Sequence, residues 1–260
     1  MTMLFDSHMH LNDERFLGRE EEVVSEAKDA GVPLLFCAGY DLASSRKAVE
    51  LAERFPGVYA FVGFHPENLE GVSEEALEEI ASLAKSKKVV GIGEIGLDYH
   101  WFKDPGDHEK QKTWFARQID LANALGLPVS IHAREAYGDL LLFLKEHPIE
   151  KGGVLHCYSG SPEMMREFAK LGLYFGFDGP ITYKNAVTPK ECVKACPLDR
   201  ILVETDSPYL PPVPFRGKEN GPKYIPYIAR EMASLKGMEL DDLAEALNEN
   251  LNRLFHVKHG

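Results

Sequence analysis

Short apolar runs recur along the whole chain, and a polar or helical stretch follows each of them. Each run contains five or six residues and is rich in Val, Ile, Leu, Phe or Tyr. This pattern is typical of strands that are buried on both faces of a parallel sheet. The eight predicted strands span residues 3–7, 33–38, 58–63, 89–94, 128–132, 153–157, 173–177 and 201–205.

Segments between and after these runs have helical periodicity. In residues 107–125, Phe115, Ile119 and Ala122 recur at helical spacing, and Gly126 occupies the position of a C-terminal cap. The other predicted helices span residues 74–84, 139–146, 224–235 and 240–254.

Strands that alternate with helices imply parallel pairing through right-handed crossovers. Eight such units in 260 residues predict an α/β protein with a (βα)₈ TIM barrel. An open doubly wound sheet is the alternative, because periodicity does not show that the sheet closes. No linker or low-complexity tract divides the chain, so we expect a single domain over residues 1–260.

Composition narrows the class of protein. The chain is 44% hydrophobic and 27% charged, which excludes an intrinsically disordered or collagen-like protein. Its net charge of −12 argues against non-specific binding to duplex nucleic acid, which requires Lys and Arg to neutralise phosphates.

Targeting signals are not evident in the sequence. The first residues lack a basic and apolar leader, no run approaches 18 apolar residues, and the four cysteines form no CxxC pair. We therefore expect a cytoplasmic protein with no membrane partner and no obligate protein partner.

Metal-ligand side chains stand where the predicted strands end. His8 and His10 are two residues apart in an extended segment, so both rings can reach one ion, although a satisfied surface pair has the same spacing. Four later strand ends carry further ligand-type residues: Glu94, His132, His156 and Asp206. In a barrel these ends meet at the face where active sites lie.

This combination of side chains indicates the chemistry. Four histidines and two carboxylates are too many for one tetrahedral zinc. They suit two divalent ions bridged by a carboxylate, an arrangement that promotes displacement at phosphorus by a metal-activated water. The chain has no GxSxG elbow and no P-loop, so a serine nucleophile and nucleotide-driven transfer lack a motif.

Motifs that carry a family resemblance occur in order along nearly the whole chain. They are residues 6–10 (DSHMH), 63–66 (GFHP), 91–99 (GIGEIGLDY), 131–134 (IHAR), 156–160 (HCYSG), 204–210 (ETDSPYL) and 216–220 (RGKEN). The chain resembles the TatD family of metal-dependent deoxyribonucleases, within the amidohydrolase-like barrel superfamily. One departure is Pro66-Glu67, where a family member shows Pro-His.

The resemblance implies roles for the strand-end residues. His8, His10 and Asp206 correspond to ligands of one divalent ion, His132 and His156 to ligands of a second, and Glu94 to the carboxylate that bridges them. The ions are Zn, Mn or Mg. Asp206 is also the expected proton acceptor, and Glu94 and His65 complete the catalytic set. His65 is expected to contact substrate phosphate rather than metal.

The resemblance also implies a substrate. We expect a 3'-5' exonuclease that acts on DNA, as single strands or 3' ends. The alternatives are a hydrolase of small amides, lactones or phosphotriesters on the same site, and a non-enzymatic metal-binding or docking protein. Bound cations would dominate the local field, so the net charge does not exclude a DNA end.

Several residues around the expected site are candidates for contact with substrate: His65, Tyr99, Arg134, Glu204 and Arg216. Glu204 has structural pairing as its alternative. Trp101 and Phe102 could stack on a base or cover the top of the barrel. Strand alternation predicts that Cys157, beside His156, points away from the metals.

Overall fold

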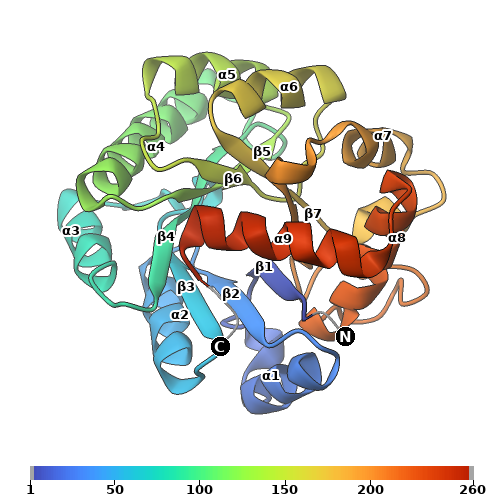
Figure 1. The fold of residues 1–260 in the computed structure, drawn as a ribbon. Helices are drawn as coiled ribbons and strands as arrows, with labels where there is room; N and C mark the ends of the chain where they lie inside the picture. The colour runs from blue at the N-terminus through green and yellow to red at the C-terminus, as the bar shows by residue number, and fades with distance from the viewer. Residues whose placement is uncertain (1–2, 258–260) are drawn as a thin grey trace.

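Eight parallel strands form one sheet in the computed structural model, which describes residues 3–257 (Figure 1). The strands are β1 (Phe5–Met9), β2 (Leu34–Ala38), β3 (Val58–Val62), β4 (Val89–Asp98), β5 (Val129–Arg134), β6 (Gly153–Leu155), β7 (Leu173–Phe177) and β8 (Ile201–Val203). Each predicted apolar run overlaps one of them, although β1, β4 and β5 extend beyond the predicted ends. Every residue of β2 and β7 is buried, because one face of the sheet packs inside the barrel and the other packs under helices.

The sheet closes into a barrel. Its strands pair in sequence order from β1 to β8. Beyond the end of β8, the Asp206 N–H donates to the His8 carbonyl at 3.0 Å, and the His10 N–H donates to the Ser207 carbonyl at 2.8 Å. The predicted (βα)₈ barrel is therefore confirmed, and the doubly wound alternative is excluded because it requires the strand order to reverse.

Helices surround the barrel (Figure 1). They are α1 (Glu20–Asp29), α2 (Leu42–Arg54), α3 (Glu74–Leu83), α4 (Pro105–Leu125), α5 (Tyr137–Glu146), α6 (Pro162–Lys170), α7 (Val187–Ala195), α8 (Ile225–Lys236) and α9 (Leu240–Phe255). The sequence analysis did not identify α1, α2, α6 or α7. The helix α6 could have been recognised from Met165 and Phe168, which recur at helical spacing, and from Ser161, whose side chain caps its first turn. The Asp41–Ser44 capping box could have revealed α2.

The terminal helix α9 closes the end of the barrel where the strands begin, and Figure 1 shows it lying across the front. The ring of Phe255 packs 5.3 Å from the rings of both Phe36 and Phe61. The Asn250 side-chain amide donates to the carbonyls of Leu198 and Ile201 at 2.9 Å. The opposite end, where the strands finish, is left for the functional site.

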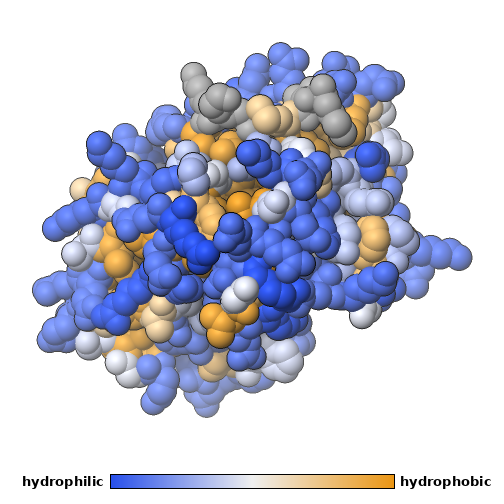
Figure 2. Space-filling view, turned by 90° about the horizontal axis from the view of Figure 1, so that it is seen from below, coloured by the Kyte–Doolittle hydropathy of each residue, from blue (hydrophilic) through white to orange (hydrophobic). Residues whose placement is uncertain are grey.

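The face shown in Figure 2, which is seen from below the view of Figure 1, is mainly polar. Apolar residues appear on it as separate patches. Among residues 3–257 no helix is both long and apolar enough to cross a membrane.

Candidate metal centre

A pocket of about 560 Å³ lies at the carboxyl ends of the strands. The side chains that line it include five of the six predicted metal ligands, His10, Glu94, His132, His156 and Asp206, together with His65. The remaining predicted ligand, His8, is completely buried beneath them. The structure thus brings together all seven residues that the sequence analysis placed at the catalytic centre.

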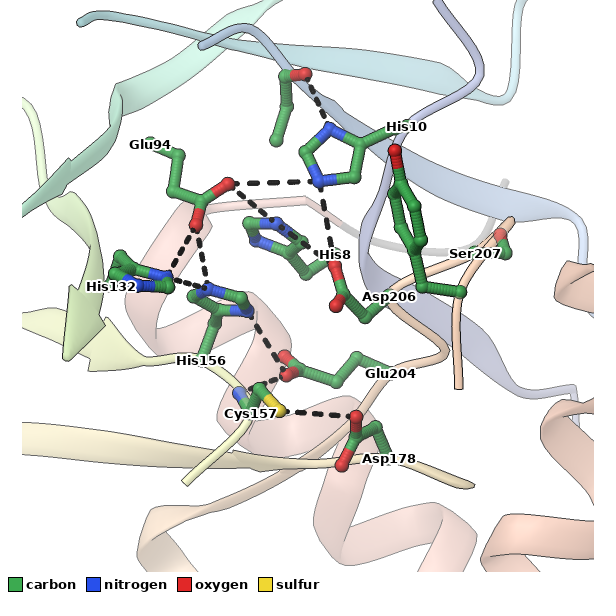
Figure 3. A network of polar contacts seen from close by, with 12 residues as sticks. His8, His10, Glu94, His132, His156, Cys157, Asp178, Glu204, Asp206 and Ser207 are labelled. Atoms are coloured by element: carbon green, nitrogen blue, oxygen red, sulfur yellow. Dashed lines mark hydrogen bonds and ion pairs between the residues drawn. The ribbon is translucent and has the colours of Figure 1, made fainter. Parts of the chain in front are cut away.

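Glu94 lies at the middle of this group (Figure 3). Its Oε2 atom is 3.3 Å from His8 Nε2 and 3.6 Å from His10 Nε2. Its Oε1 atom is 3.0 Å from His132 Nδ1 and 2.8 Å from His156 Nε2. The two oxygens of one carboxylate therefore face two different pairs of imidazoles, which is the placement that a bridging ligand requires.

Asp206 lies beside His8 and His10, the two histidines that face Glu94 Oε2. Its Oδ1 atom lies 3.4 Å from His10 Nε2 and 3.9 Å from His8 Nε2. One ligand atom from each of these three residues lies within 4.8 Å of the other two. Side chains two residues apart on an extended strand point the same way, so the rings of His8 and His10 lie on one side of β1, as the sequence predicted. Asp206 reaches them from beyond β8 with a φ of 52°, in the left-handed region.

Hydrogen bonds determine which nitrogen of each ring faces the centre. His10 Nδ1 lies 3.1 Å from the Ala38 carbonyl, so Nδ1 carries a proton and Nε2 is the nitrogen that faces the centre. His132 is turned the other way, because its Nε2 lies 2.9 Å from Asp98 Oδ2 and its Nδ1 faces inward. Both rings have the arrangement of metal-binding histidines, whose second nitrogen donates to an oxygen.

The other two imidazoles also turn Nε2 toward Glu94. His156 Nδ1 is buried with no hydrogen-bond partner among the described residues, and Glu204 Oε1 lies 3.6 Å from it. His8 Nδ1 contacts Ser130 Oγ at 3.2 Å, and the buried His8 Nε2 has no hydrogen-bond partner among the described residues. Burial and the adjacent His156 lower the pKa of His8, which favours the neutral ring. A divalent cation is the partner that suits this orphaned nitrogen, so the residues fit a metal centre.

His65 differs from these four histidines. The backbone N–H of Glu67 donates to His65 Nδ1 at 3.2 Å, which occupies the lone pair of that nitrogen. Burial lowers the pKa of His65, so the neutral ring carries its single proton on Nε2. This Nε2–H lies 3.3 Å from Glu94 Oε1 and can donate a hydrogen bond to it, although one ligand atom each from His65, Glu94 and His132 also lies within 4.8 Å of the other two.

The pKa values of the two carboxylates in the cluster, Glu94 and Asp206, are both lowered. Burial by itself would raise the pKa of Glu94, but His156, His65 and His132 outweigh it and hold that pKa well below its ordinary value. Burial would likewise raise the pKa of Asp206, yet the hydrogen bond with His10 and the neighbouring imidazoles lower it. Both carboxylates are therefore ionised and able to act as ligands.

Glu204 does not reach the pocket, so its expected contact with substrate is corrected by the structure. Its side chain is fully buried behind His156. One oxygen accepts the Cys157 N–H, and the other accepts Ser7 Oγ–H at 3.3 Å. Gly176 makes room for this carboxylate, because a Cβ atom there would collide with it. Glu204 is a positioning residue for His156.

The structure also corrects the prediction that Cys157 points away from the site. The strand β6 ends at Leu155, and Cys157 adopts a φ of 45°, so strand alternation no longer applies. Cys157 lines the pocket, and its thiol donates to Asp178 Oδ2 at 3.2 Å (Figure 3). Burial, together with the carboxylates of Glu204 and Asp206, raises the pKa of Asp178 well above its ordinary value.

The remaining expected substrate contacts divide into two groups. Arg134 lines the pocket. Tyr99 and Arg216 are not among the lining residues: the Tyr99 hydroxyl donates to Asp139 at 3.1 Å, and the Arg216 guanidinium lies 4.4 Å from the centre of the Tyr183 ring.

Asp98 contacts the candidate site through His132, and the sequence analysis does not include it among the site residues. It lies in the motif of residues 91–99, but the apolar run predicts a fourth strand that ends at Glu94, whereas β4 continues to Asp98. The glycines in this segment weaken the strand signal in the sequence, because glycine is depleted in strands. The signal that could have found it is the spacing of four residues from Glu94, which places both side chains on one face of an extended strand.

Comparisons with known proteins agree with this geometry. The family model described as TatD related DNase matches residues 5–256. The metal-dependent hydrolase YabD of Bacillus subtilis is 45% identical, over 98% of this chain and 100% of the relative. The 3'-5' ssDNA/RNA exonuclease TatD of Klebsiella pneumoniae is 34% identical, over 98% of each chain.

Two solved structures have a similar fold. The crystal structure of YjjV, a TatD homologue from Escherichia coli K12, superposes with a TM-score of 0.92 at 33% identity, covering 98% of each chain. A phosphotriesterase homology protein from Escherichia coli shares the fold at 17% identity and a TM-score of 0.67, over 98% of this chain and 99% of that one. The chain belongs to the TatD family of metal-dependent hydrolases.

Proposed function

We propose that the protein hydrolyses phosphodiester bonds of DNA with two divalent ions. His8, His10 and Asp206 would hold one ion, His132 and His156 would hold the other, and Glu94 would be shared between them. The observation that carries this proposal is the position of Glu94, whose two carboxylate oxygens face separate pairs of imidazoles. When bound, Zn, Mn or Mg ions polarise the phosphoryl group and activate water.

The chain's own residues supply proton transfer and orientation. Asp206 is ionised and lies on the pocket wall, so its carboxylate accepts the proton that the attacking water loses. His65 Nε2–H donates to a non-bridging phosphoryl oxygen, where negative charge grows in the transition state. Arg134 provides a fixed positive charge at the same pocket.

The proposed substrate is the 3' end of a single DNA strand. A relative that is 34% identical carries the name 3'-5' ssDNA/RNA exonuclease. The net charge of −12 disfavours a long duplex, whereas a metal-centred pocket requires favourable contact at one phosphate only.

The cytoplasmic location expected from the sequence stays a prediction.

The test uses a single-stranded oligonucleotide labelled at its 5' end, incubated with Mg²⁺, Mn²⁺ or Zn²⁺. We expect a ladder of products shortened from the 3' end, which EDTA and Asp206→Asn abolish. Asp139→Asn makes the same change at a surface carboxylate on α5 and should retain activity. If no metal supports shortening, the nuclease proposal is wrong, and turnover of a lactone or phosphotriester panel would favour the alternative hydrolase.

A further inference from the structure

The loop between β4 and α4 carries an exposed tryptophan. The side chain of Trp101 is 62% exposed. Because most of the indole faces solvent, it does not cover the top of the barrel, which was the alternative considered from the sequence. An exposed indole offers a flat aromatic face on which another aromatic ring can stack.

Asp98 fixes the position of this tryptophan relative to the proposed metal centre. Asp98 Oδ1 accepts the backbone N–H groups of His100 at 2.8 Å and Trp101 at 3.1 Å. The other oxygen of the same carboxylate lies 2.9 Å from His132 Nε2. One side chain therefore holds both the turn that presents the indole and an imidazole of the metal centre.

Arg134 links the indole to the pocket. It stands two residues after His132 at the end of β5 and lines the pocket. Its guanidinium carbon lies 5.4 Å from the centre of the Trp101 ring, within the range of a cation–π contact. Within residues 3–257 no ion pair or side-chain hydrogen bond engages this guanidinium, so its N–H groups can bind a phosphate.

From these contacts we infer that Trp101 is a stacking platform for a nucleobase of the strand whose phosphate occupies the pocket. The inference rests on the proposed function and specifies how the strand is held. A nucleic acid presents an aromatic base beside each anionic phosphate, which matches an indole beside an unpaired guanidinium. Stacking does not depend on base identity, so the platform favours unpaired ends without a sequence preference.

Kinetics provide the first test. Two single-stranded oligonucleotides are compared, one intact and one with abasic sites at its two 3'-terminal nucleotides. Trp101→Ala should lower kcat/KM on the intact strand by about tenfold and leave the abasic strand nearly unchanged, while Trp101→Phe retains most of the activity. Leu142→Ala is the matched control, because it truncates a side chain that is 63% exposed on α5. An equal loss on both strands, or no loss, overturns the inference.

Fluorescence provides a test that does not require cleavage. The chain has two tryptophans, and Trp114 is partly buried against the core. Adding oligothymidylate should quench the emission of the wild-type protein, and Trp101→Phe should remove most of that quenching. If quenching persists in this variant or is absent from the wild type, Trp101 is not the platform. Failure of the proposed function would appear separately, as quenching without cleavage.

Discussion

His132 Nε2 lies 2.9 Å from Asp98 Oδ2, and this contact turns His132 Nδ1 toward Glu94. The two residues are 34 positions apart and stand near the ends of neighbouring strands, β4 and β5. The carboxylate thereby selects both the orientation and the tautomer of the imidazole. Outer carboxylates of this kind raise the basicity of a metal-binding histidine.

Asp98→Asn should weaken metal binding by about 10- to 100-fold. In the native protein one oxygen of Asp98 faces His132 and the other accepts two backbone N–H groups. An asparagine amide has only one oxygen, so it cannot accept hydrogen bonds from His132 and from the two backbone N–H groups at once. Metal affinity, measured by competition with a chromophoric chelator, should fall. Asp139→Asn should leave the affinity unchanged, and an unchanged affinity for Asp98→Asn would contradict the assigned role.

His65→Ala should lower kcat by about 100-fold without changing the metal content. The reason is that His65 Nδ1 already accepts the Glu67 N–H, so Nε2 carries the proton and acts as a donor. Metal analysis beside steady-state kinetics separates this role from that of a ligand. Restoring a donor with His65→Gln should recover part of the rate. Loss of a bound ion from His65→Ala would show instead that His65 is a ligand.

Glu67→Gln should lower KM for an anionic diester by about two- to fivefold. Glu67 lines the pocket, and its negative charge repels a phosphate across a partly solvated gap, which costs ~0.5–1 kcal/mol. The effect should shrink as salt is added, because added ions screen the charge. Glu70→Gln, a fully exposed carboxylate three residues away, should leave KM unchanged. An increase in KM for Glu67→Gln would mean that the carboxylate assists binding.

Removing divalent ions should lower the melting temperature. Ions that bind the folded chain at about 100 times Kd add about 2.7 kcal/mol, which corresponds to a shift of about 5–10 °C for a protein of this size. Adding Mn²⁺ or Zn²⁺ after EDTA treatment should restore the wild-type value, as measured by scanning calorimetry. The melting temperature of Glu94→Gln should change little with these ions. That of Glu79→Gln, a change at a surface ion pair on α3, should change as in the wild type. An equal response from both variants would argue against Glu94 as a ligand.

Local features of the sequence determined most of the fold. The eight strand positions could be predicted because strands buried on both faces form uninterrupted apolar runs, which involve only neighbouring residues. The common side of His8 and His10 follows from alternation along a strand, which is equally local. The glycine-containing end of β4 escaped prediction, because glycine is depleted in strands and this segment is held by its pairing with β5.

The tertiary structure alone decided the details of the site. The left-handed turn at Cys157 directs its thiol toward Asp178, and burial removes Glu204 from the substrate side. The contact between Ser7 and Glu204 joins residues 197 positions apart. The sequence by itself determined which metal-binding side chains reach the barrel's carboxyl-terminal face. Only the closed barrel determined which nitrogen or oxygen each one presents, because those orientations depend on hydrogen-bond partners from distant strands.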